Sequence, residues 1–296
     1  MSEAIRILLQ TTIEPTADDW SIARFGLLRE HLATLRDAHG NAMCEVDARD
    51  RTAPAGQPDP VLSTLETSDY DELWLFAVDT GNGLHADDCA GITRFRARGG
   101  GLLVTRDHMD LGCSVCALGG VGRAHHFHST NPERDPQRQC IDDVATAYIQ
   151  WPNYHSGANG DYQDVHLEGP PHPLFAGVRF LPAHPHEGAV DAPEGDASAR
   201  VIASGRSRVS GRPFNLAVAF EASAEGGRGV AQSTFHHFCD YNWDTEKGCP
   251  SFVSEAPGNA LGGFPPAQAS IRRYSRNLAL WLAGREVEIE AIATAP

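Results

Sequence analysis

The chain has 296 residues, 41% of them hydrophobic and 21% charged, so it can bury a sizeable core and is not disordered. Its 39 Asp and Glu outnumber its 24 Lys and Arg, which gives a formal net charge of −15. Because this charge repels phosphate backbones and no basic patch offsets it, no nucleic-acid partner is expected.

A single lysine, Lys247, argues against Schiff-base chemistry and a Walker-type phosphate loop, so neither pyridoxal phosphate nor a nucleotide cofactor is expected. Residues 1–10 contain Glu3 and lack the basic and long apolar stretches of a signal peptide. No apolar run approaches the roughly 20 residues that span a bilayer, so no membrane partner is expected. The seven cysteines are interpreted as reduced thiols of a cytoplasmic protein.

Strand and helix patterns alternate along the first 105 residues. Short apolar runs predict strands at 5–10, 43–46, 73–78 and 102–105, and helical spacing of apolar residues predicts helices at 17–38 and 86–98. Repeated β–α–β units of this kind indicate a parallel sheet with right-handed crossovers.

Residues 106–193 are rich in His, Gly and Pro and show little periodicity, which is typical of a long irregular insertion. Regular patterns resume afterwards, with predicted strands at 199–203, 214–220 and 229–235 and a closing helix at 271–282. No repeat or low-complexity linker divides the sequence. We therefore expect one α/β domain spanning residues 1–296, with the insertion at about 106–193.

Polar residues follow two of the predicted strands directly. Asp107 and His108 come after the strand at 102–105, and His236 and His237 come after the strand at 229–235. In an open parallel sheet, ligands bind at the carboxyl ends of the strands. A histidine beside a carboxylate suits proton transfer or metal binding. The competing interpretation is that these side chains cap helices and fill hydrogen bonds in turns.

The run 151–163 combines aromatic and polar side chains, which suits a sugar or another polyhydroxylated ligand, although an ordered surface loop would have the same composition. We expect the pocket to bring together the loops 106–110, 153–163 and 236–242. The candidate substrate-binding residues are Asn153, Tyr154, His155, Asn159, Tyr162, His237, Asp240 and Asn242.

The segment 182–188 carries His184, His186 and Glu187 beside two prolines. Side chains alternate along an extended backbone, so His184 and His186 would face one side and Glu187 the other. All three can face one site only if the chain turns there.

Cys113 and Cys116 have the spacing of a zinc-binding pair, and His125, His126 and His128 follow them. Two cysteines and two histidines would make a tetrahedral structural zinc site. Since no second pair has standard spacing, the histidines could equally be a polar lining of the insertion.

Short motifs follow one another in a particular order along nearly the whole chain. They are Gly99-Gly100-Gly101, the strand ending near His108, His155, His172-Pro173, Glu187, Gly227-Arg228-Gly229 before His236, and a closing helix with Trp281. This order resembles the trehalose-utilisation (ThuA-like) branch of the class I glutamine amidotransferase-like superfamily. The resemblance implies a flavodoxin-like three-layer sandwich around a central, mostly parallel sheet.

Within the ThuA-like branch, the resemblance also implies a metal or acid–base site on His108, His155, Glu187 and His236. Amidotransferases of this superfamily place a cysteine nucleophile on the elbow after the glycines. The elbow here contains Asp107 and His108, neither of which can form a thioester. A Cys-dependent glutaminase is therefore not expected.

These observations predict an enzyme that acts on a small polar, carbohydrate-related molecule by hydrolysis, isomerisation or elimination. His108 and His236 would be acid–base groups or ligands of a divalent metal such as zinc, with Asp107 and Glu187 orienting them or completing the coordination. Two alternatives stay open: a non-catalytic ligand-binding or accessory protein on the same scaffold, and a structural zinc protein. The sequence also leaves open whether His236 or His237 faces the site, and whether the chain forms a homo-oligomer.

Overall fold

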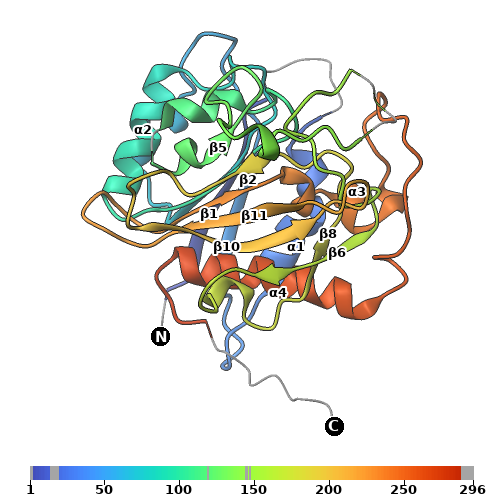
Figure 1. The fold of residues 1–296 in the computed structure, drawn as a ribbon. Helices are drawn as coiled ribbons and strands as arrows, with labels where there is room; N and C mark the ends of the chain where they lie inside the picture. The colour runs from blue at the N-terminus through green and yellow to red at the C-terminus, as the bar shows by residue number, and fades with distance from the viewer. Residues whose placement is uncertain (1–2, 14–19, 119, 144–145, 147, 288–296) are drawn as a thin grey trace.

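The computed structural model describes residues 3–13, 20–118, 120–143, 146 and 148–287 (Figure 1). Its centre is an eight-stranded sheet in the order β2-β1-β3-β4-β12-β11-β10-β7. The first five of these strands are parallel: β2 (Cys44–Arg49), β1 (Ile5–Thr11), β3 (Glu72–Phe76), β4 (Gly101–Thr105) and β12 (Gly229–Gln232). The other three extend the sheet in antiparallel fashion: β11 (Pro213–Phe220), β10 (Ala199–Arg206) and β7 (His166–Leu167).

The five parallel strands have the order 2-1-3-4-5 in the sheet, which is the flavodoxin-like arrangement. The flavodoxin-like α/β fold with a mostly parallel sheet is therefore confirmed by the strand order. The right-handed crossovers of such units place helices on both faces of the sheet.

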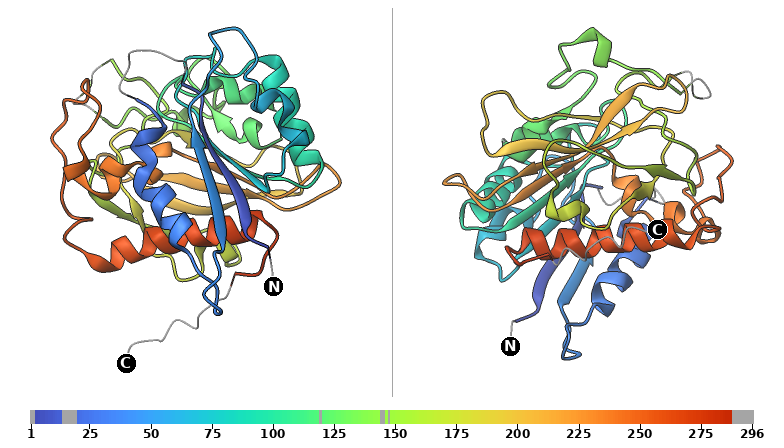
Figure 2. Two further views of the ribbon diagram at one scale, coloured as in Figure 1. Left: turned by 180° about the vertical axis from the view of Figure 1, so that it is seen from behind. Right: turned by 60° about the horizontal axis from the view of Figure 1, so that its bottom comes forward.

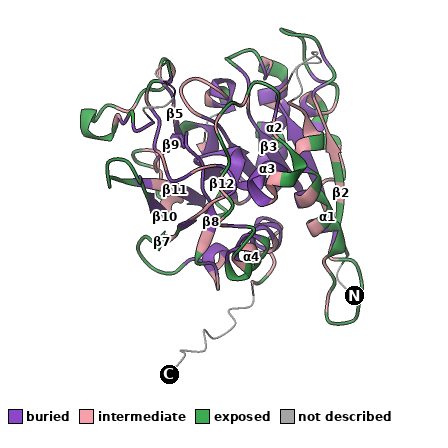
Figure 3. Ribbon diagram, turned by 90° about the vertical axis from the view of Figure 1, so that its right-hand side faces the viewer, coloured by how far each residue is buried: buried purple, intermediate pink, exposed green. Residues whose placement is uncertain are grey.

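Two hydrophobic cores, one on each face, hold the helices against the sheet. Alternate residues of a strand enter different cores: Trp74 and Phe76 pack with α1 (Gly26–Thr34) and α4 (Pro265–Leu282), while Leu73 and Leu75 pack with α2 (Ala86–Ala97). Figure 2 shows α1 and α4 on one side of the sheet and α2 on the other. The central strands are buried along their length and the edge strand β2 is partly exposed (Figure 3).

Short elements fill the insertion and the loops of the sheet. Two small antiparallel pairs form, β5 (His125–His126) with β9 (Ala189–Val190) and β6 (Tyr162–Asp164) with β8 (Phe180–Pro182). The 3₁₀ helices are η1 (Ile22–Phe25), η2 (Leu62–Thr67), η3 (Cys113–Leu118), η4 (Gly120–Ala124), η5 (Pro136–Arg138), η6 (Pro173–Phe175), η7 (Phe235–Phe238) and η8 (Thr245–Lys247), and α3 covers Asp240–Trp243.

The predicted helices differ from the observed ones at their ends. The helix expected at 17–38 is shorter, because the backbone becomes extended at Leu35, and residues 17–19 lie outside the described chain. The closing helix begins earlier than expected, since Pro265 and Pro266 occupy its first turn, where an amide hydrogen is not needed. Every helix in the described ranges is too short or too polar to cross a lipid bilayer.

Candidate functional site

A cavity of about 570 Å³ opens where β3, β4 and β12 end. Its wall includes Val78 after β3, Asp107 and His108 after β4, and Phe235 and His236 after β12. Ligands bind at this edge in open α/β sheets. The loops 106–110 and 236–242 thus reach the cavity as expected, and residues 153–163 contribute Asn159.

The loop after β4 is held in position by Arg106, whose side chain is completely buried. Its guanidinium donates hydrogen bonds to four backbone carbonyl oxygens, those of Asp107, Met109, His126 and Ala189. Met109 has a left-handed backbone with a φ of 50°, which turns the chain sharply just after His108. This buried anchor fixes the place from which the Asp107 and His108 side chains enter the cavity.

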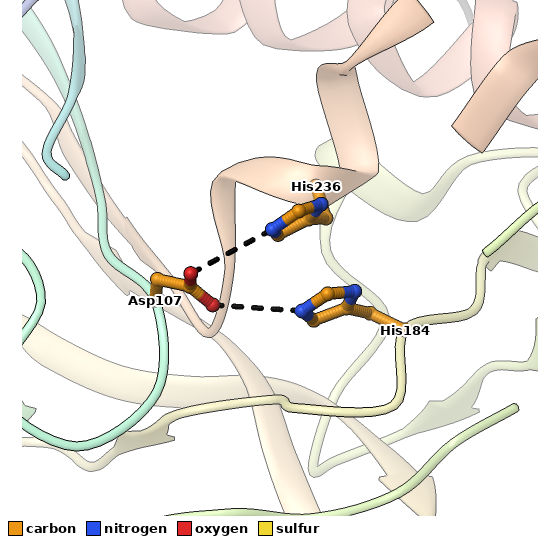
Figure 4. A group of neighbouring side chains, drawn as sticks. All are labelled: Asp107, His184 and His236. Carbon is orange, nitrogen blue, oxygen red and sulfur yellow. Dashed lines mark ion pairs between the residues drawn. The ribbon is translucent and has the colours of Figure 1, made fainter. Parts of the chain in front are cut away.

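The Asp107 carboxylate faces the edges of two imidazole rings that come from distant segments (Figure 4). Oδ1 is 3.5 Å from Nε2 of His184, and Oδ2 is 3.7 Å from Nε2 of His236. The exposed fractions of Asp107, His184 and His236 are only 6%, 3% and 7%. Nδ1 of His108 approaches Oδ1 from a third direction, at 3.3 Å.

The electrostatics of this group favour a charged carboxylate. Burial by itself raises the pKa of Asp107, but the neighbouring His108 and His236 outweigh it and hold this pKa well below its ordinary value. Burial and the proximity of His236 hold the pKa of His184 well below its ordinary value. Asp107 is therefore an anion, and His184 is a neutral imidazole.

Asn242 determines which ring nitrogen of His236 carries a hydrogen. The amide nitrogen of Asn242 donates to the carbonyl oxygen of Ala183 at 3.1 Å, which fixes the orientation of the amide group. The amide oxygen therefore faces Nδ1 of His236 at 3.2 Å. An amide oxygen can only accept, so Nδ1 of His236 is the donor.

The same reasoning extends to His184 through Asn159. The amide nitrogen of Asn242 also donates to Oδ1 of Asn159 at 2.9 Å, so that atom is an oxygen and accepts. It lies 2.8 Å from Nδ1 of His184, which must therefore donate to it. In the neutral rings, both Nε2 atoms then carry lone pairs directed at the Asp107 carboxylate.

A second group of side chains contributes His186 and Glu255 to the wall of the same cavity. Nε2 of His186 donates a hydrogen bond to Oδ2 of Asp143, and both side chains are buried. Glu255 completes the group, with one ligand atom of each residue lying within 4.8 Å of the others. The His186 ring centroid is 5.1 Å from that of His108 and 5.4 Å from that of His184. The cavity therefore has two adjacent groups of histidines and carboxylates.

Glu187 and His237 do not line the cavity and form a separate buried cluster. Tyr274 donates to Oε1 of Gln232 at 2.5 Å, so the Gln232 amide nitrogen donates to Nδ1 of His237 at 2.7 Å. Nε2 of His237 then donates to Glu187 at 3.2 Å. His236 is thus the member of the pair that faces the cavity.

The four residues that the resemblance implies as a metal or acid–base site are not brought together. His108 and His236 line the cavity, whereas Glu187 points to the opposite side of the extended segment that carries His184 and His186. Nδ1 of His155 is buried without a hydrogen-bond partner in the described residues, and His155 is not a lining residue. The structure places His184 and Asp107 with His236 instead.

Several expected substrate-binding residues have structural contacts away from the cavity. Tyr154 stacks on Phe214 with ring centroids 5.0 Å apart, and its hydroxyl donates to the Arg138 carbonyl. Tyr162 packs against Phe264, and the Asp240 carboxylate accepts from the first two amides of α1. The side-chain amide of Asn153 is buried, with no hydrogen-bond partner in the described chain. Asn159 and Asn242 act on the site by orienting histidine rings.

The cysteines lie outside the groups of metal-ligand spacing and outside the cavity lining among the described residues. Two groups of described residues have the spacing of metal ligands, and neither contains a cysteine. Sγ of Cys116 lies 3.9 Å from the His125 carbonyl oxygen, and Cys239 is buried with its pKa held well above the ordinary value by desolvation. The described lining of the cavity likewise includes no cysteine.

The sequence interpretation missed Asp143 and Glu255 and gave His184 and His186 no role. Alternation in the segment 182–188 was the one signal that pointed to His184 and His186. Nothing local distinguishes Asp143 or Glu255 from other acidic residues of a chain with 39 of them.

No protein-family model matches the chain, and no curated protein matches it. Among solved structures, it is similar to a ThuA-like protein from Parabacteroides merdae ATCC 43184, with 14% identity, a TM-score of 0.48, and coverage of 97% of this chain and 92% of the other. The glutaminase domain of CTPS from Trypanosoma brucei, with bound acivicin, has the same identity and TM-score, with 97% of each chain covered. A cytoplasmic protein from Salmonella typhimurium LT2 has 10% identity and a TM-score of 0.48, with coverage of 93% and 99%.

These similar structures include a ThuA-like protein and a glutaminase domain, the two groups that the sequence resemblance names. The assignment of the fold rests on the strand order of the sheet.

Proposed function

We propose that the protein is an enzyme that hydrolyses a small, polar, uncharged molecule of carbohydrate type in the cavity at the carboxyl edge of the sheet. The observation that carries the proposal is the placement of two histidine–carboxylate groups at one cavity, lined by Asp107, His184 and His236 of the first group and by His186 and Glu255 of the second. Perturbed titratable groups that converge in a cleft are typical of catalytic sites.

His186 is the group best placed to transfer a proton. Its Nε2 is engaged by the buried Asp143, which leaves Nδ1 as the other nitrogen of the ring. A histidine held by a carboxylate in this way keeps one tautomer and offers its other nitrogen as a base. In the proposed reaction, Nδ1 of His186 accepts a proton from the attacking water and returns it to the leaving group.

The lining of the cavity supports a substrate with both polar and apolar faces. Trp20, Phe235 and Phe252 contribute aromatic surface, and Phe252 and Tyr148 are 58% and 78% exposed. Aromatic rings beside polar groups suit the stacked, hydrogen-bonded recognition of sugars. No arginine or lysine belongs to the described lining, which favours an uncharged substrate over a phosphorylated one.

The proposal is tested by assaying the protein against uncharged glycosides, sugar esters and N-acetylated sugars, and by comparing the wild type with His186→Ala. Removal of a general base is expected to lower kcat by about 10²–10⁴-fold. His166→Ala is the matched control, because His166 is exposed on the edge strand β7, away from the cavity. Turnover that is equal in H186A and the wild type would contradict the role of His186, and binding of sugars without turnover would contradict hydrolysis.

A further inference from the structure

We infer that Asp107, His184 and His236 form a binding site for one divalent transition-metal ion of the zinc type. This site goes beyond the proposed hydrolysis, because it follows from the contacts of three side chains and not from any substrate. Its three ligand atoms are hydrogen-bond acceptors that face one another inside the protein.

The two tautomers leave no hydrogen between these acceptors. Nδ1 of His236 donates to Asn242 and Nδ1 of His184 donates to Asn159, so the Nε2 atom of each ring in its neutral form carries a lone pair. Both Nε2 atoms face the carboxylate oxygens of Asp107. Acceptors that converge in this way repel one another unless a cation lies between them.

Burial makes the unpaired atoms more costly, because water cannot replace a missing partner. Oδ1 of Asp107 and Nε2 of His184 are both buried and have no hydrogen-bond partner in the described residues. The exposed fractions of the Asp107 and His184 residues are only 6% and 3%. Both atoms are directed into the space shared with His236.

The separations also suit a metal better than a shared proton. The distances of 3.5 Å and 3.7 Å from the carboxylate oxygens to the ring nitrogens exceed those of good N–H···O hydrogen bonds. Ligands bound at about 2.0–2.2 Å to a tetrahedral zinc ion lie about 3.4 Å from one another. One ligand atom of each residue lies within 4.8 Å of the other two.

The donor set identifies the class of ion. Two imidazoles and one carboxylate suit zinc and other first-row transition metals, whereas calcium and magnesium prefer sites made of oxygen ligands. The hydrogen bonds from both Nδ1 atoms are the outer contacts that hold metal-binding imidazoles in place. Three protein ligands leave a coordination position open, and all three line the cavity.

The experiment uses the full chain, purified without a polyhistidine tag and stripped with a chelator. Isothermal titration calorimetry measures the affinity of the protein for Zn²⁺. Titration with Co²⁺, followed by its visible absorption, measures a second affinity and reports the ligands around the bound ion. We expect the wild type to bind the ion, and Asp107→Asn, His184→Gln and His236→Gln each to weaken binding, on the order of 100-fold. His166→Ala controls for the exposed histidines of the chain.

Circular dichroism and thermal unfolding of the stripped proteins show which variants fold, and three separate ligand variants keep the test informative if one does not. An absence of binding by the folded wild type at millimolar Zn²⁺ and Co²⁺ overturns the inference. The inference is also overturned if all three ligand variants still bind the ion and Glu255→Gln does not. The ion would then occupy the group of Asp143, His186 and Glu255.

The inference and the proposed function can fail separately. If H186A abolishes turnover while the wild type binds neither ion, the metal site is wrong and the hydrolysis stands. If the ion binds as expected and no substrate is hydrolysed, the metal site stands and the proposed function is wrong.

Discussion

The imidazole rings of His184 and His236 lie nearly parallel, with centroids 3.6 Å apart and planes inclined by 12°. One ring comes from the insertion and the other from the loop after β12. Two charged imidazolium rings at this separation would repel each other strongly, so the stack favours neutral rings. The parallel arrangement also directs both Nε2 atoms to the same carboxylate. Stacking and hydrogen bonding thus prepare the pair to accept a cation.

The first prediction concerns Asn242, which orients both rings. Asn242→Leu removes the acceptor for His236 and the donor to Asn159. We expect the affinity for Zn²⁺ or Co²⁺ to fall about 10–100-fold, as is usual when the partner of a metal-binding histidine is lost. Asn277→Leu is the matched control, because Asn277 is equally buried and donates to carbonyl groups beside η6. Isothermal titration of the folded variants measures both affinities. If N242L and N277L lowered the affinity for the ion equally, this role of Asn242 would be contradicted.

Much of the fold could be predicted from the sequence because its signals are local. The runs that became β1, β3 and β4 are apolar on both faces, as strands buried between two layers must be. The loop rule then placed Asp107 and His236 at one edge of the sheet. Their proximity follows from topology, and topology is encoded in the order of the elements.

The rest of the site depends on packing between segments that are far apart in the sequence. His186 meets Asp143, 43 residues away, and Thr146 donates to Glu255, 109 residues away. No periodicity connects such positions. The choice of Glu187 as a site residue illustrates the limit, because alternation in the segment 182–188 already indicated that it faces away from His184 and His186. The order of family motifs suggested a role for Glu187, whereas its carboxylate lies beside His237 and outside the cavity lining.

The second prediction concerns Glu187, whose carboxylate accepts hydrogen bonds from Ser156, Gln163, Ser233 and His237. Glu187→Gln puts an amide nitrogen where an acceptor is needed. The free energy of unfolding should fall by about 1–3 kcal/mol, measured by urea denaturation. The exposed Glu168→Gln serves as the control. Metal binding by the folded E187Q protein should equal that of the wild type, and its loss would make Glu187 a ligand after all.

The contribution of the Glu187 carboxylate to stability should depend on pH in a definite direction. Burial raises the pKa of Glu187, but the neighbouring His237 and the hydroxyl donors outweigh it, so the pKa is below its ordinary value. A carboxyl group with a lowered pKa stabilises the folded state above its ordinary pKa, and this stabilisation is lost as the pH falls through the folded-state value. The difference in the free energy of unfolding between the wild type and E187Q should therefore become smaller in acid.

The third prediction is that cysteine chemistry plays no part in catalysis. The elbow after β4 contains Asp107 and His108, and burial raises the pKa of Cys113 and holds that of Cys239 well above the ordinary value. Cys113→Ala, Cys116→Ala and Cys239→Ala should leave kcat within about twofold of the wild type, whereas H186A should lose it. The protein should also release no ammonia from glutamine. Ammonia release that disappears in any one cysteine variant would show that a thiol is the nucleophile.

The fourth prediction concerns Glu72, a completely buried carboxyl group at the start of β3. Its Oε2 accepts from the Trp74 indole at 2.7 Å, and its Oε1 has no hydrogen-bond partner in the described chain. Burial, assisted by the neighbouring Asp71, raises the pKa of Glu72 well above its ordinary value. The folded protein therefore holds a proton here that the unfolded chain releases at lower pH.

Because the folded state binds this proton more tightly, the free energy of unfolding falls as the pH rises from the ordinary pKa toward the folded-state pKa. At a pH above both pKa values, each pKa unit by which the folded-state value exceeds the unfolded-state value lowers the free energy of unfolding by about 1.4 kcal/mol. Glu72→Gln keeps an oxygen for Trp74 and carries no charge, so it should match the wild type in acid and be more stable at neutral pH. Urea denaturation over a range of pH measures the difference. Glu45→Gln, on the exposed side of β2, should change stability by no more than about 0.5 kcal/mol throughout. If E72Q were less stable than the wild type at every pH, the ionised Glu72 would be a stabilising group. Its burial would then not destabilise the folded protein at neutral pH.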